Sequence, residues 1–223
     1  LRAAYAALPA RLAARAKGEP TPERRRVFLE HLERKLWGQP VQRDAFAAAL
    51  TDESPDIRLY AAATMGVVDT LVDLARDTSL AGELRAQALG YINARIAKRT
   101  IERAQIETAL APLIETRELE APLALELAKA LGLYPHPRGE EPLIALVGYP
   151  DDAVQRAAIA SLGERGTAAC VPALLAQRKA FELGTGNGAR DALQKVRARL
   201  GPQNAGGLAV AEADGALAVV EES

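Results

Sequence analysis

Hydrophobic residues recur along most of the chain at intervals of three and four, which places them on one face of an α-helix. Pro and Gly divide this pattern into segments of ordinary helix length. The segment from Thr21 to Gly38 is typical, because a hydroxyl residue, Pro22 and Glu23 are residues that favour a helix start. We expect further helices over residues 2–16, 40–50, 54–66, 68–76, 100–115, 140–148, 170–183 and 188–200.

An internal repeat organises these segments. Residues 54–66 and 151–163 share a β-branched residue, Ala four positions later, a large apolar residue at eight and Gly at nine. The first three of these positions lie on one helical face, and the small Ala lets a neighbouring helix approach closely. We expect the glycines, Gly66 and Gly163, to end their helices in the left-handed conformation.

Two weaker copies of the repeat lie between these. They begin at Leu84 and Leu123, and the first has Asn93 where the others have Gly. The four copies therefore begin at Ile57, Leu84, Leu123 and Val154, at spacings of 27, 39 and 31 residues. A second apolar helix follows each of them, so the pattern predicts a series of helix pairs.

The last copy resembles the HEAT-repeat family, in which antiparallel helices are paired. The resemblance rests on Asp151, Val154, Ala158, Leu162-Gly163 and the following Val171-Pro172-Ala173-Leu174, and residues 57–66 match nearly as well. It covers about residues 40–200 and departs from the family pattern at Gln155, where Arg is usual.

The resemblance implies an all-α fold, a right-handed α-α superhelix of about four or five HEAT-like helix pairs. In such a solenoid each pair buries its core against its neighbours, so the ends need caps. We expect residues 1–50 to form an N-terminal helical cap, 51–200 the repeats and 201–223 a separate extension. The helix at 188–200 would close the other end of the stack.

The C-terminal extension has a different pattern. Residues 208–212 and 217–221 alternate in hydrophobicity around Asp214-Gly215, which predicts a β-hairpin. A lone hairpin is marginal in water, so it would dock on the solenoid or on the sheet edge of a partner. An acidic tail without fixed structure is the alternative.

Composition agrees with a helical protein. The 223 residues include 28 basic and 29 acidic side chains, 49% of residues are hydrophobic and only 4% are aromatic. Such a chain is too apolar to be disordered, and its alanine-rich core favours close-packed helices over sheets. No apolar run is long enough to cross a bilayer, so we expect no membrane span.

The sequence offers little material for catalysis or cofactor binding. Cys170 is the one cysteine, and His31 and His136 have no second ligand at metal-binding spacing. Residues 184–188 resemble a phosphate loop superficially but lack its Lys and a preceding strand. We therefore expect no cofactor, no metal and no enzymatic activity, and the lone thiol favours a cytoplasmic location.

We expect a scaffold that binds another protein on its concave face, through the second helix of each pair. The candidate contact residues are Asp69, Asp73, Arg76, Arg103, Glu107, Arg178, Lys179 and the single tryptophan, Trp37. The tyrosines at 60, 91, 134 and 149 lie near expected helix ends and are further candidates for such contacts.

Two other functions stay open. Residues 1–50 carry ten basic and five acidic side chains, and phosphate contacts by Arg25 and Arg26 would suit nucleic acid. The isoelectric point of about 6.3 argues against a general basic footprint. The chain begins at Leu1 rather than Met, so we also consider a processed or truncated piece, such as a regulatory domain of a larger enzyme.

Overall fold

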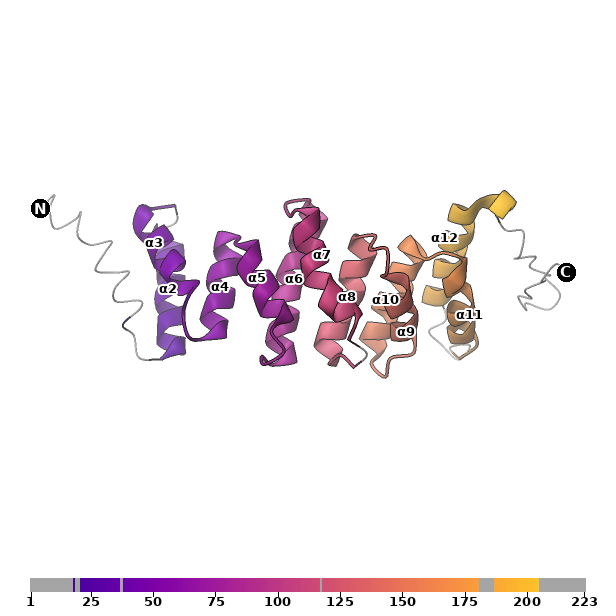
Figure 1. The fold of residues 1–223 in the computed structure, drawn as a ribbon, viewed down its shortest axis with the longest axis horizontal. Coiled ribbons are helices and arrows are strands. Elements are labelled where there is room, and N and C mark those ends of the chain that lie inside the picture. The colour runs from indigo at the N-terminus through magenta and orange to yellow at the C-terminus, as the bar shows by residue number, and fades with distance from the viewer. Residues whose placement is uncertain (1–17, 19–20, 37, 117, 181–186, 205–223) are drawn as a thin grey trace, which may run out of the picture. The chain divides into compact units, whose positions relative to one another are not determined.

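The computed structural model describes residues 18, 21–36, 38–116, 118–180 and 187–204. Over these residues the regular elements are α-helices and one 3-10 turn (Figure 1). The helices are α2 (Pro22–Leu36), α3 (Pro40–Ala49), α4 (Pro55–Met65), α5 (Val68–Arg76), α6 (Gly82–Lys98), α7 (Arg103–Ile114), α8 (Ala121–Leu133), α9 (Glu140–Val147), α10 (Asp152–Arg165), α11 (Val171–Ala180) and α12 (Asn187–Asn204), with the 3-10 turn η1 (Ala168–Cys170) before α11.

The predicted helices within the described ranges are confirmed, with ends that agree to within a few residues. Local chemistry explains several starts. Thr21 caps α2, since its Oγ1 accepts a hydrogen bond from the Arg24 amide at 3.4 Å. Asp151 caps α10 by accepting from the amides of Ala153 and Val154. The expected helix at 2–16 and hairpin at 208–221 lie outside the described residues, whereas residues 201–204 continue α12.

The chain divides into two compact units after Pro112. In the first unit, α4 packs against α2, α3, α5 and α6, and α5 packs against α6. A shared core joins α2, α3 and α4, with Leu29, Phe46 and Ile57 fully buried at its centre. Helices α2, α4 and α6 are the first members of successive pairs, and α3, α5 and α7 are the second members.

The second unit is built around α10, which packs against α8, α9 and α12. In this unit α8, α10 and α12 are the first helices of their pairs, while α9 and α11 are second helices (Figure 1). Within each unit, the first helix of one pair thus neighbours the first helix of the next pair. This is the stacking that a helical repeat requires.

Most repeat positions lie in the core, as expected. Ile57, Leu123 and Val154, which begin three of the copies, are at most 1% exposed. Two repeat positions lie outside the core. Met65, the large apolar residue of the first copy, is 39% exposed, and Leu84 is only partly buried. The other two apolar repeat positions of α6, Ala88 and Ile92, do lie in the core together with Leu89, each at 0%.

The role expected for the repeat's last position is confirmed at Gly66 and wrong in the other three copies, including Gly132, which lies inside α8. Gly66 ends α4 in the left-handed conformation with φ 78°. Gly163 lies inside α10 and Asn93 inside α6, where the left-handed terminus is Arg99 with φ 55°. A Cβ on Gly163 would lie 3.1 Å from the Cα of Ala192 in α12. This glycine therefore permits close helix packing and does not cap the helix.

Arginines connect each of three first helices to the end of the preceding one. Arg165 of α10 donates to the carbonyl of Gly132 at 3.1 Å, at the end of α8. Arg199 of α12 donates to the carbonyls of Gly163 and Glu164, near the end of α10. Arg95 of α6 packs beside Gly66, which ends α4. The guanidinium groups of Arg165 and Arg199 satisfy helix carbonyls that have no partner within their own helix.

Candidate interaction surfaces

The second helices of the first unit carry exposed charged side chains, as the sequence suggests. Asp69, Asp73 and Arg76 are exposed on α5. Asp69 accepts a hydrogen bond of 2.8 Å from the Nε2 atom of Gln105 on α7. This bond brings polar groups of two successive second helices side by side, which is the arrangement that a continuous binding face needs.

Helix α7 contributes two further candidates. Arg103 and Glu107 form an ion pair of 2.8 Å one helical turn apart, and the Arg103 side chain is 74% exposed. Such a solvent-exposed ion pair adds little stability. The side chains of Arg178 and Lys179, on α11, and the whole of Trp37 lie outside the described part of the chain.

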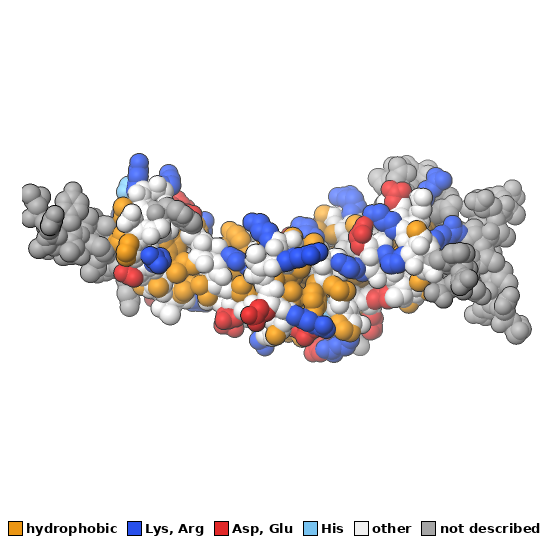
Figure 2. Space-filling view, turned by 90° about the horizontal axis from the view of Figure 1, so that it is seen from above, with side chains coloured by type: hydrophobic (Ala, Val, Ile, Leu, Met, Phe, Trp, Pro, Cys, Tyr) orange, Lys and Arg blue, Asp and Glu red, His pale blue; other side chains and the backbone are white. Residues whose placement is uncertain are grey.

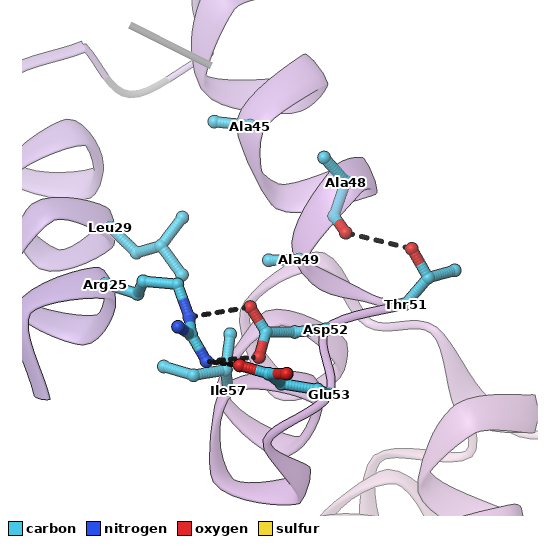
Figure 3. Close-up of a pocket in the computed structure, with 9 residues that line it drawn as sticks. All are labelled: Arg25, Leu29, Ala45, Ala48, Ala49, Thr51, Asp52, Glu53 and Ile57. Atoms are coloured by element: carbon cyan, nitrogen blue, oxygen red, sulfur yellow. Dashed lines mark hydrogen bonds and ion pairs between the residues drawn. The ribbon is translucent and has the colours of Figure 1, made fainter. Parts of the chain in front are cut away.

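The basic cluster of α2 contacts the protein itself. Arg25 is 5% exposed, and its guanidinium lies 2.9 Å from Asp52 and 3.2 Å from Glu53 (Figure 3). A phosphate contact by Arg25 is therefore wrong for this structure. The ion pair instead fixes α2 against the turn between α3 and α4, and it borders a cavity of about 290 Å³.

Other basic side chains of α2 also have acidic or aromatic neighbours. Arg26 pairs with Glu30 and lies 4.5 Å from the ring centre of Tyr60, and Arg34 pairs with the same glutamate. Tyr60 donates a short hydrogen bond to Glu33, and burial together with this bond raises the pKa of its phenol. On the face drawn in Figure 2, Lys and Arg side chains are interspersed with hydrophobic and neutral surface.

The second unit contains a groove that the sequence analysis did not identify. It has a volume of about 980 Å³ and lies between the end of α7, the loop before α8, and α9. We name it the α9 groove. The residues that form its apolar part include Leu113, Ile114, Leu119, Ile144, Ala145 and Tyr149.

The tyrosines named from the sequence occupy different surroundings. Tyr149 lines the α9 groove, and its hydroxyl donates to the Leu119 carbonyl at 2.7 Å. Tyr91 is 45% exposed, whereas Tyr134 is partly buried beside the His136 ring. Of these candidates, Tyr149 is the one that the structure places in a groove. The sequence therefore indicated one residue of this groove, Tyr149, but not the other residues that line it.

The surroundings of Cys170 and His136 indicate structural roles and not catalytic ones. Cys170 is buried, and burial, with Glu140 nearby, raises the pKa of its thiol from 9.0 to about 11. A thiol with such a pKa is protonated at neutral pH and is a poor nucleophile. His136 accepts a hydrogen bond from the Arg138 amide in a turn. Within the described ranges, His, Cys, Asp and Glu side chains form no group of three or more that could hold a metal ion.

Helix pairs stacked in sequence order define a helical-repeat protein of the α-solenoid class. Residues 109–182 match a family model described as HEAT repeats, which confirms the resemblance to that family for this part of the chain. No curated protein and no solved structure matches the chain significantly. In the part of the chain that the structure describes, no helix combines the length and apolar character needed to cross a membrane.

Proposed function

We propose that this protein is a non-catalytic scaffold that binds a partner protein through the face formed by its second helices. In a right-handed superhelix of helix pairs, the second helices line the concave side. The match to HEAT repeats supports this general role, because the family commonly mediates protein interactions. The observation that carries the proposal is the hydrogen bond between Asp69 of α5 and Gln105 of α7, which joins exposed polar groups of neighbouring second helices.

The physical basis is a preorganised surface. Helices packed on a buried core hold their outward side chains in a fixed array, so a partner meets many weak contacts at once. Charged side chains on this array would steer the partner and select its orientation. Asp73 and Arg76 lie three residues apart on α5 and present both signs of charge.

A charge-swapped variant tests the proposal. The double substitution Asp73→Lys with Arg76→Glu keeps the net charge but exchanges the two signs on a second helix. Arg190→Glu with Asp191→Lys makes the same exchange at exposed positions of the first helix α12 and serves as the control. The partner is captured from the native cell and identified by mass spectrometry, and its affinity for each purified variant is then measured.

The proposal predicts that the α5 variant loses about tenfold or more in affinity for this partner, while the α12 control retains it. If both variants bind the partner with the same affinity, the contact lies elsewhere and the proposed second-helix face is wrong. Retention on heparin and duplex DNA with a steep dependence on salt would favour the nucleic-acid alternative. We expect no such retention, because Arg25 is buried and Arg26 and Arg34 are paired with carboxylates.

A further inference from the structure

We propose that the α9 groove binds a short segment of a partner protein that carries apolar side chains flanked by Lys or Arg. This inference rests on the proposed scaffold function and assigns a site and a ligand chemistry to it. The groove is lined entirely by residues of the second unit. It is distinct from the charged face of α5 and α7 named above.

The apolar part of the groove supplies the first argument. Ile114, Leu119 and Ile144 remain partly exposed, and Ala145 is exposed. The volume of about 980 Å³ lies at the upper end of the range for ligand pockets and is large enough for several side chains. Covering this surface would remove apolar area from water, which favours binding.

The charges at the groove supply the second argument. Its described lining holds three carboxylates, those of Glu115, Glu140 and Glu141, and one guanidinium, Arg138. Arg138 is paired with Glu115 at 3.1 Å, so its charge is already compensated. Over the whole segment 113–149 the sequence has six acidic and three basic residues. Charge complementarity therefore favours a partner segment with basic flanks.

The groove is also held in shape by its own contacts. The Tyr149 hydroxyl fixes the loop at Leu119 against the end of α9. Glu140, at the start of α9, accepts hydrogen bonds from the amide and hydroxyl of Thr167. These bonds connect the walls to the rest of the unit, so little conformational freedom is lost when a segment binds.

Two substitutions and two matched controls provide the test. Ala145→Arg places a large cation in the middle of the groove, and Ala94→Arg places the same side chain at an exposed position of α6. Glu141→Lys reverses an exposed charge in the first turn of α9, and Glu83→Lys does the same in the first turn of α6. Thermal unfolding followed by circular dichroism verifies that each variant is folded.

The probe is a random-peptide display library selected on the full chain, followed by fluorescence anisotropy of the enriched peptides with each variant. We expect the enriched peptides to combine apolar residues with Lys or Arg. We expect Ala145→Arg to weaken their binding about tenfold or more and Glu141→Lys to weaken it about threefold, more at low salt than at high salt. The two α6 controls should bind as the unsubstituted chain does.

The inference is overturned if no peptide is enriched, if the enriched peptides are acidic or uncharged, or if Ala145→Arg leaves their binding unchanged. Failure of this inference differs from failure of the scaffold function. If a native partner is lost on charge exchange at Asp73 and Arg76 but retained by Ala145→Arg and Glu141→Lys, the scaffold function stands and the groove assignment falls. If neither native protein nor peptide binds, both fall.

Discussion

Glycine at single positions decides how closely the first helices approach one another. Gly132 of α8 faces Ser161 of α10, and a Cβ at Gly132 would clash with the Ser161 hydroxyl and lie 2.9 Å from its Cβ. Ser161 is itself buried, and it donates to the Ala128 carbonyl at 2.7 Å. The serine therefore cannot move aside without losing a buried hydrogen bond.

Gly132→Ala should lower the free energy of unfolding of the protein by about 1–3 kcal/mol, because overpacking outweighs the better helix propensity of alanine. Gly188→Ala is the matched control, since a Cβ at Gly188 would lie 4.0 Å from the Cγ2 atom of Ile159. The control should leave stability unchanged or raise it slightly. Urea unfolding followed by circular dichroism measures both, and equal midpoints for the two variants would contradict the packing account.

At the scale of helices, the boundaries were largely predictable because they depend on local chemistry. Pro22, Pro40 and Pro55 each occupy the first position of a helix, as the sequence pattern suggested. The internal positions were harder to predict. Gly66 and Gly163 occupy the same repeat position, but Gly66 ends α4 whereas Gly163 lies inside α10, which continues to Arg165. The close approach of α12 explains why glycine stands at position 163.

The α9 groove was not predictable from periodicity for a related reason. Ile114 and Ile144 fit an apolar helical pattern, which indicates burial and does not show that a neighbour is missing. The exposure follows from how α7, α8 and α9 pack, a tertiary property. By contrast, Asp69, Asp73 and Arg76 were correctly expected at the surface, because charged residues on a helix rarely lie in a core.

The arginines that join successive first helices, which we call arginine clamps, can be predicted in part from their spacing in the sequence. Arg95 and Arg165 each lie eleven residues after the position that begins their repeat copy, Leu84 and Val154. Both contact the end of the preceding first helix, as Arg199 does. The spacing places a guanidinium three turns along the helix, where the neighbouring helix exposes its last carbonyls.

Arg199→Ala should lower the free energy of unfolding by about 1 kcal/mol, since three carbonyls near the end of α10 lose a charged donor that is partly in water. Arg197→Ala, at an exposed position of the same helix, is the control and should have little effect. Urea denaturation of both variants provides the comparison. If Arg197→Ala destabilises as much as Arg199→Ala, the loss reflects helix α12 in general and the clamp is unimportant.

For the whole molecule, the repeat explains why we expect binding at exposed surfaces of the second helices. Each unit builds a continuous core from helix pairs, with first helices joined by small residues and arginine clamps. The second helices carry the exposed charged side chains of α5 and α7 and the apolar residues of the α9 groove. A scaffold of this kind distributes its contacts over several elements, so no single residue determines binding alone.

Amide hydrogen exchange of the full chain, with and without its captured partner, tests this account most directly. The account predicts that the partner slows exchange in peptides covering α5, α7 and α9 more than in peptides covering α4, α6 and α10. Slowed exchange confined to the first helices α4, α6 and α10, or no change in either set when the partner is bound, would contradict it.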